Sequence, residues 1–134
     1  SIMSGPARSG LVIYAKDLAH LAQFYTQILN MHFVHQSSEL VVLDSADLQI
    51  VLHAIPAEIA QRIEISQPPQ RRENVAMKFF ASVASLAAAQ ELVQQLGGEV
   101  FADAWEGPGF RVCNAMDPEG NVFQLREPTD SAAS

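Results

Sequence analysis

The chain has few basic residues. Lys and Arg number eight against fifteen Asp and Glu, which gives a formal net charge of -7. Apart from the pair Arg71 and Arg72, the basic residues are spread along the sequence. No stripe of positive charge is present that could neutralise a phosphate backbone, so we expect no nucleic-acid partner.

Long apolar runs and pairs of cysteines are also missing. No run approaches the roughly 20 apolar residues that cross a bilayer, and the first ten residues lack the apolar core of a secretory signal. The single Cys113 has no partner for an internal disulfide, as is usual in a reducing compartment. We therefore expect a soluble, cytoplasmic protein that does not bind membranes. Its 134 residues, 49% of them apolar, suffice for one domain with a packed core.

Strand and helix patterns follow one another in the same order in both halves of the chain. In the first half, an apolar run at 11–14 precedes a helix that begins at Asp17 and ends at Asn30. Three expected strands follow it, at 32–35, 40–43 and 48–52.

The second half repeats this order. A strand at 75–80 precedes a helix that begins at Ser85 and ends at Gly97 and Gly98. Three further strands are expected at 100–101, 110–115 and 122–126. The sequence thus predicts an α+β fold of two βαβββ modules that form a curved mixed sheet around a cleft.

The expected boundaries follow from this pattern. A tail covers 1–9, one domain covers 10–127, and a second tail covers 128–134. Within the domain, module one is 10–54, a proline-containing linker with a short helical turn is 55–74, and module two is 75–127.

One turn makes this pattern specific. Asp117-Pro118-Glu119-Gly120-Asn121 leads directly into the apolar run 122–125, a sequence in which Pro118 sets φ and Gly120 permits a positive φ. With the repeated strand order, this turn resembles the vicinal oxygen chelate superfamily, which includes glyoxalase I, bleomycin-resistance proteins and extradiol dioxygenases. The resemblance extends from about Gly10 to Glu127 and implies a homodimer.

In metal-dependent members of that superfamily, four side chains, usually His and Glu, converge on one divalent ion. Their positions fall here on Gly10, Val51, Lys78 and Gln124. Glycine and valine carry no donor atom, and a lysine ammonium has no lone pair. Of the four histidines, only His53 shares strand parity with one of these positions. The resemblance therefore implies no metal site and no cofactor.

If those four positions face the cleft, strand alternation brings neighbouring side chains to it. We predict that these residues bind the ligand: Tyr14, Val51, His53, Lys78, Phe80, Trp105, Phe110 and Gln124. The polar members suit a carbonyl or an oxyanion, and the apolar ones suit a hydrophobic body. An alternative for Lys78 is a side chain that reaches solvent beside a closed core. The Gly- and Pro-rich segment 105–110 is either a flap over the pocket or a hairpin connection.

The leading hypothesis is metal-independent binding of a small organic molecule with an apolar part and an acidic or oxo group. Catalytic residues stay unidentified. The first alternative is a metal-dependent lyase or dioxygenase with non-standard ligands. The second is a drug-sequestering protein of the bleomycin-resistance type, in which Glu99, Asp103 and Glu106 would attract a cationic drug.

Overall fold

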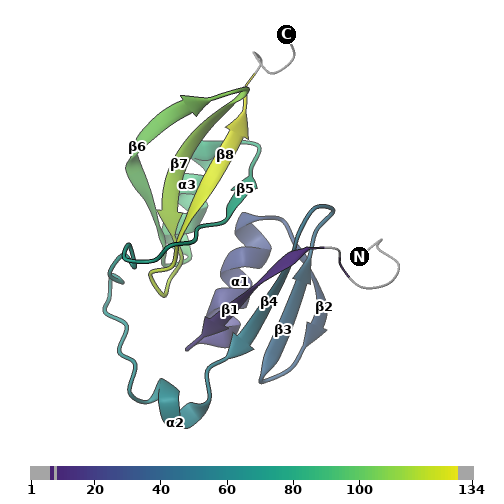
Figure 1. The fold of residues 1–134 in the computed structure, drawn as a ribbon, viewed down its shortest axis with the longest axis vertical. Coiled ribbons are helices and arrows are strands. Elements are labelled where there is room, and N and C mark those ends of the chain that lie inside the picture. The colour runs from purple at the N-terminus through teal and green to yellow at the C-terminus, as the bar shows by residue number, and fades with distance from the viewer. Residues whose placement is uncertain (1–6, 8, 130–134) are drawn as a thin grey trace. The chain divides into compact units, whose positions relative to one another are not determined.

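The computed structural model describes residue 7 and residues 9–129, and the chain divides into two compact units, Ser1–Glu64 and Ile65–Ser134 (Figure 1). Each unit contains one four-stranded sheet and one long helix. The division falls within the segment predicted to link the two modules. Of the predicted tails, 1–9 and 128–134, the larger part lies outside the described residues.

The first unit has the predicted strand and helix order. Its elements are β1 (Gly10–Ala15), α1 (Leu18–Ile28), β2 (His32–Gln36), β3 (Leu40–Asp44), β4 (Gln49–Ala54) and the short α2 (Ala57–Ala60). The sheet order is β1-β4-β3-β2, with β1 parallel to β4 and the other pairs antiparallel. This mixed sheet confirms the predicted βαβββ module.

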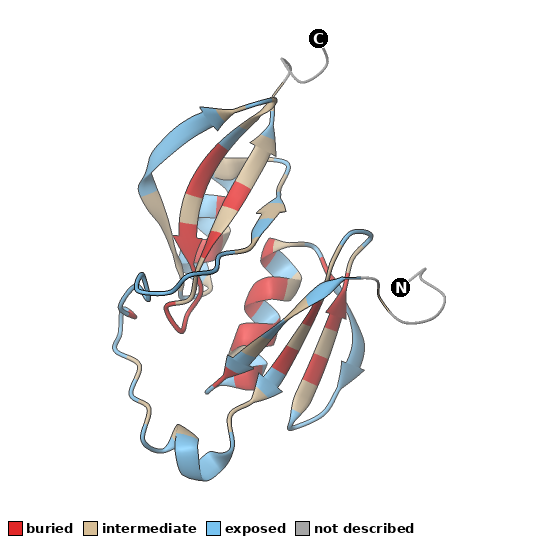
Figure 2. Cartoon of the chain, in the orientation of Figure 1, coloured by how far each residue is buried: buried red, intermediate tan, exposed pale blue. Residues whose placement is uncertain are grey.

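The ends of α1 follow from its flanking residues. Asp17 accepts a hydrogen bond from the backbone N–H of His20 at 3.1 Å, and Asn30 adopts a positive φ of 52° just after the helix. Between these ends, Leu21, Phe24 and Tyr25 are fully buried. The helix therefore packs one apolar face on β3 and β4, where the buried positions are also concentrated (Figure 2).

The second unit repeats the arrangement. Its elements are β5 (Phe80–Ser82), α3 (Leu86–Gln95), β6 (Glu99–Gly107), β7 (Phe110–Met116) and β8 (Val122–Pro128). The sheet order β5-β8-β7-β6 again places the first strand of the unit parallel to its last strand. The internal symmetry extends to the register, because Val12 pairs with Val51 in the first sheet and the corresponding Phe80 pairs with Gln124 in the second.

Helix α3 begins where it was expected. The Ser85 hydroxyl accepts a hydrogen bond from the N–H of Ala88 at 3.1 Å, and the Glu127 carboxylate accepts one from the N–H of Leu86 at 2.7 Å. Two helix residues, Ala89 and Val93, are buried on the sheet. The apolar stripe is narrower than predicted, because the remaining leucines of this helix are only half-buried.

One segment prediction was wrong, and one of two alternatives left open by the sequence is observed. The strand expected at 75–80 begins only at Phe80, because Val75 and Met77 point to solvent and 75–79 forms no ladder with a neighbouring strand. The segment 105–110 is no flap, because β6 continues to Gly107 and pairs directly with β7. Its alternative reading as a hairpin connection is the one observed. The turn contains only Pro108 and Gly109, with Gly109 at a φ of 79°.

No helix within the described ranges is both long and apolar enough to span a membrane.

The turn before β8 is held by a buried carboxylate. Asp117 is fully buried and accepts hydrogen bonds from the N–H of Glu119 at 2.8 Å and from the backbone and side-chain N–H groups of Asn121 at 3.1 and 2.8 Å. Gly120 completes the turn at a φ of 88°. The predicted role of this pentapeptide is thus confirmed.

Replacement of Gly120 by alanine should destabilise the protein by about 2 kcal/mol or more, since a positive φ is costly for residues with a side chain. An added Cβ would also collide with the backbone oxygen of Gln70. Urea denaturation measures the loss. The matched control is Glu73→Ala at an exposed position of the preceding segment, which should change the unfolding free energy by less than about 0.5 kcal/mol. Equal stability of the two variants would contradict this account.

Candidate functional site

Each sheet is covered by its helix on one face, and we call the opposite face of each sheet its open face. Strand alternation places the predicted ligand-binding residues that lie in strands on one of these two open faces, and Lys78 reaches the second of them through its contact with Asn114. Large apolar side chains remain exposed there, with Tyr14 62%, Phe80 53% and Trp105 44% exposed. Exposed apolar and aromatic groups mixed with polar ones are typical of a binding surface.

The open face of the first sheet brings Tyr14 and His53 together. They pair across the β1–β4 ladder, and their ring centroids lie 5.5 Å apart. His53 Nδ1 lies 2.9 Å from the carbonyl oxygen of Ala54, which can only accept, so Nδ1 carries the proton. In the neutral ring, Nε2 therefore presents a lone pair. Val51 precedes this pair on the same face.

A groove lies beside His53, entirely within the first unit. Its volume is about 800 Å³, and its walls come from the end of β4, the turn before β3 and helix α2. Lys16 and Glu39 line it with His53, and Lys16 also donates a hydrogen bond to the backbone oxygen of Ile63. Strand parity predicts His53 but not this groove, because the groove depends on how the segment after β4 folds back.

The open face of the second sheet carries a guanidinium between two rings. Arg126 Cζ lies 3.6 Å from the centroid of the Phe80 ring and 4.3 Å from that of Phe110. Such cation–π contacts contribute on the order of 1 kcal/mol each and fix the plane of the guanidinium. Arg126 Nε is buried and has no hydrogen-bond partner. Within the part of the chain that the structure describes, no carboxylate forms an ion pair with Arg126.

Lys78 and Gln124 lie on this same face. Lys78 Nζ donates to Asn114 Oδ1 at 3.5 Å, and Asn114 pairs with Gln124 across the β7–β8 ladder. Gln124 is in turn the partner of Phe80. The structure thus brings together the predicted residues of the second unit and adds Asn114 and Arg126 to them. Arg126 has the strand parity of Gln124, but no local pattern in the sequence predicts that two rings contact its guanidinium.

The position of Phe110 depends on a glycine. Gly107 pairs with Phe110 at the end of the β6–β7 ladder, and a Cβ at Gly107 would collide with the Phe110 ring. Trp105 stands two residues earlier on β6, opposite Val112. The absence of a side chain at Gly107 is therefore what lets Phe110 lie across the strand pair and contact Arg126.

The four positions at which relatives bind a metal do not form a donor set. Gly10 pairs with Gln49 so closely that a Cβ there would stand 2.6 Å from the Gln49 carbonyl oxygen. Val51 offers only carbon, and Lys78 offers an ammonium that is already directed at Asn114. Among residues 7 and 9–129, no group of three or more His, Cys, Asp or Glu could hold a metal ion. The residues present do not fit the ion of the superfamily.

Cys113 is not a candidate nucleophile. It is buried on the helix-covered face of the second sheet, and desolvation by burial raises the pKa of its thiol, an effect that Arg111 partly opposes. The group therefore stays protonated at neutral pH.

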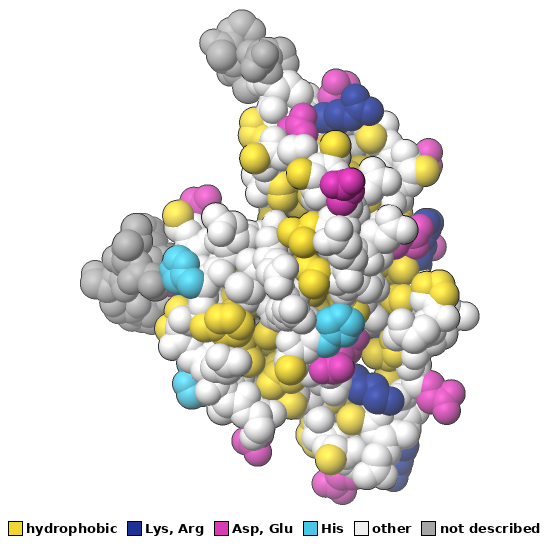
Figure 3. Space-filling model, turned by 180° about the vertical axis from the view of Figure 1, so that it is seen from behind, with side chains coloured by type: hydrophobic (Ala, Val, Ile, Leu, Met, Phe, Trp, Pro, Cys, Tyr) yellow, Lys and Arg dark blue, Asp and Glu magenta, His cyan; other side chains and the backbone are white. Residues whose placement is uncertain are grey.

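On the face of the chain in Figure 3, Lys and Arg side chains, drawn in dark blue, are few and separated from one another. Of the acidic residues that could have attracted a cationic drug, Glu99 forms an ion pair with Arg71 at 3.0 Å. The prediction that the two open faces enclose a common cleft stays a prediction, as does the homodimer.

A Gly107→Ala substitution should displace the Phe110 ring and thereby one of the two contacts of Arg126. The side-chain Nε–H resonance of Arg126, shifted by the two rings in the parent protein, should move toward the value of an exposed arginine. Gly98→Ala, at a glycine without a positive φ, is the control and should leave that resonance in place. An unchanged Arg126 resonance in Gly107→Ala would show that Phe110 does not depend on this glycine.

Comparison with known proteins agrees with this architecture. A family model described as a glyoxalase-like domain matches residues 10–126. The comparison with curated proteins found no match. The solved structure of the fosfomycin resistance protein FosX from Listeria monocytogenes aligns with a TM-score of 0.64 at 20% identity, covering 98% of this chain and 97% of that chain.

Two further solved structures are similar. One is a glyoxalase/bleomycin resistance protein/dioxygenase family enzyme from Burkholderia phytofirmans PsJN, with a TM-score of 0.61, 21% identity and coverage of 90% of this chain and 98% of that one. The other is a bleomycin-binding protein complexed with bleomycin, with a TM-score of 0.58, 16% identity and coverage of 92% and 100%. At these identities the likeness shows the fold alone.

Proposed function

The chain belongs to the glyoxalase-like domain family, within the vicinal oxygen chelate superfamily, and from that premise we propose that it binds a small anionic organic molecule without a resident metal ion. The open face of the second sheet would receive the ligand. An oxyanion would meet Arg126 and Lys78, and an apolar body would cover Phe80 and Trp105.

The unpaired Nε of Arg126 carries this proposal. A buried N–H group without an acceptor is costly, and charged donors are costlier still. Here the guanidinium is also held by two rings and lacks an acidic partner among the described residues. A carboxylate, phosphonate or enolate oxygen would supply the missing acceptor through a charge-assisted hydrogen bond.

Neighbouring residues favour the same class of ligand. Lys78 adds a second cation. The side-chain amides of Gln124 and Asn114, which pair across β8 and β7, add hydrogen-bond donors. The exposed rings of Phe80 and Trp105 supply apolar area that a hydrophobic body would cover. Two of the similar structures are a fosfomycin resistance protein and a bleomycin-binding protein, and both are concerned with small molecules.

This arrangement favours an anion over a cationic drug. Both cations of the second open face are free of acidic partners in the described part of the chain, whereas Glu99 is already neutralised by Arg71. A cationic ligand on this face would have to displace or repel Arg126 and Lys78. The remaining acidic candidates, Asp103 and Glu106, are exposed on the long β6 strand and are readily explained as solvated residues.

Arg126→Met should weaken binding of phenylphosphonate, a probe with one ring and one anionic group, by about 10- to 100-fold, as expected when a charged hydrogen bond is lost. Benzylamine, its cationic counterpart, should not bind either protein measurably. Isothermal titration calorimetry provides the affinities. Arg62→Met, at an exposed arginine of the first unit, is the matched control and should bind phenylphosphonate like the parent. Equal affinity of Arg126→Met and the parent would overturn the proposed role of Arg126.

Dialysis against Zn²⁺ or Mn²⁺, followed by elemental analysis, should leave far less than one ion per chain, because only Gln124 among the four family positions carries an atom that could coordinate a metal ion. Binding of phenylphosphonate should be the same with and without chelator. One tightly held ion per chain, or a loss of binding on chelation, would favour a metal-dependent lyase or dioxygenase with non-standard ligands instead.

A further inference from the structure

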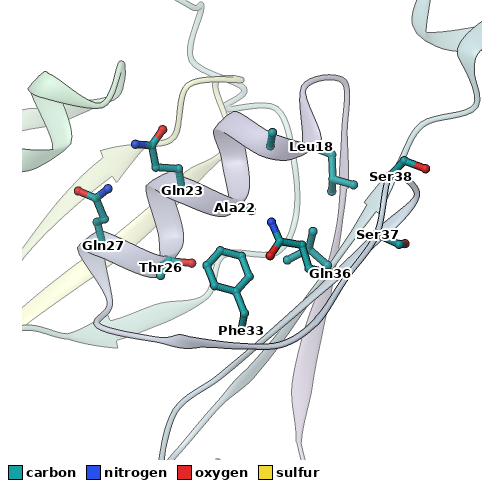
Figure 4. A pocket seen from close by; sticks show the side chains of 11 residues that line it. Leu18, Ala22, Gln23, Thr26, Gln27, Phe33, Gln36, Ser37 and Ser38 are labelled. Atoms are coloured by element: carbon teal, nitrogen blue, oxygen red, sulfur yellow. The ribbon is translucent and has the colours of Figure 1, made fainter.

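A second cavity lies in the first unit, on the helix-covered side of its sheet and therefore on the side opposite that sheet's open face. Its volume is about 340 Å³, at the lower end of the range of ligand pockets. The cavity is bounded by one side of α1, by β2 and by the turn that joins β2 to β3. Figure 4 shows the Phe33 ring rising from β2 toward α1, with Thr26 and Gln36 on either side of it.

A β-bulge produces the floor of this cavity. Phe33 pairs with Leu43 and Gln36 pairs with Val41, both of which face α1, while the register shifts between Phe33 and His35. Phe33 and Gln36 are three positions apart, so in a regular strand their side chains would point to opposite faces of the sheet. The extra residue of the bulge brings both to the same face. The bulge thus directs an aromatic ring and a carboxamide toward the same space.

The roof is formed by small residues. Helix α1 packs on β3 and β4, and every residue of β2 is exposed. Toward β2 the helix presents Ala19, Ala22 and Thr26, whose short side chains leave the space open. As a result, the Phe33 ring remains 44% exposed beneath a helix.

The Ser37 hydroxyl at the edge of the cavity is hydrogen-bonded within its own turn, but the other side chains with hydrogen-bonding groups on α1 and β2 lack partners. Thr26 Oγ1 is buried and makes no hydrogen bond, and the carboxamides of Gln23, Gln27 and Gln36 form none within the described residues. No residue that lines the cavity carries a charge. A charged ligand would therefore lose its hydration without compensation, whereas a neutral group that both donates and accepts would pair with the hydroxyl and the amides.

We propose that this cavity is a second binding site, which takes a small neutral molecule consisting of a planar ring and an amide group, such as a carboxamide or a lactam. The ring of the ligand stacks on Phe33 in an offset or edge-on geometry. Its amide exchanges hydrogen bonds with Thr26 Oγ1 and with a glutamine of the cavity. The site is independent of Arg126, so it stands or falls separately from anion binding on the second sheet.

Benzamide is the probe, and two-dimensional NMR titration is the measurement. Benzamide should shift the resonances of Thr26, Phe33 and Gln36 saturably, with a dissociation constant on the order of 1 mM, as for a weak fragment. Benzoate, which has the same shape but a negative charge, should not shift them. Absence of a saturable benzamide shift at these residues, or equal binding of benzoate there, would overturn the proposal.

Two substitutions at Thr26 separate the hydroxyl from packing. Thr26→Val keeps the shape and removes the hydroxyl, so binding of benzamide should weaken about tenfold, while the melting temperature stays the same or rises because an unpaired polar atom is gone. Thr26→Ser keeps the hydroxyl and should bind within about threefold of the parent. Unchanged benzamide affinity in Thr26→Val would contradict the assigned contact.

A blocking variant tests the location. Ala19→Trp should fill the mouth of the cavity and abolish the benzamide shifts, whereas Ala87→Trp, at an exposed alanine of α3, should leave them unchanged. Arg126→Met should also leave them unchanged. If benzamide does not bind and Ala19→Trp instead converts a sedimenting dimer to a monomer, the cavity is an interface between copies of the chain and the proposal is wrong.

Discussion

One-sided burial of each sheet is the constraint on which the rest of this structure depends. Because each unit has a single long helix, the helix covers only one face of its four strands, and the apolar residues of that face form most of the core. On the open face of the second sheet, Val112 and Met116 are buried as well. The alternate residues of the same strands face away from the helix, and several of them are exposed and can contact a ligand. They include the exposed Tyr14 in the first unit and the exposed Phe80 in the second, together with the cation of Arg126.

The same constraint explains why exposed open-face positions can differ within one fold. Helix packing uses the helix-covered positions, so exposed residues of the open face can vary at little cost to the core. In this chain Gly10 and Val51 carry no donor atom, and Lys78 carries an ammonium that has no lone pair for a metal ion. The anion binding that we propose would use Arg126 on the open face of the second sheet.

Much of the fold could be predicted from the sequence, because its signals are local. Asp17 and Ser85 begin the two helices through hydrogen bonds within one turn, and Gly120 marks the turn before the last strand. The site could be predicted only in part. Strand parity identified Phe80, but the clamp on Arg126 requires Phe110 to lie across Gly107, and the bulge beside Phe33 depends on pairing between strands. Neither contact leaves a local pattern.

The most direct test of the central claim is NMR observation of the Arg126 side-chain Nε–H during titration with phenylphosphonate. The account predicts a downfield shift of this proton as it gains an anionic acceptor, together with contacts from the phenyl ring of the ligand to Phe80. A ligand that binds while the Arg126 Nε–H resonance stays fixed would contradict it, because the unpaired guanidinium would then have no part in recognition.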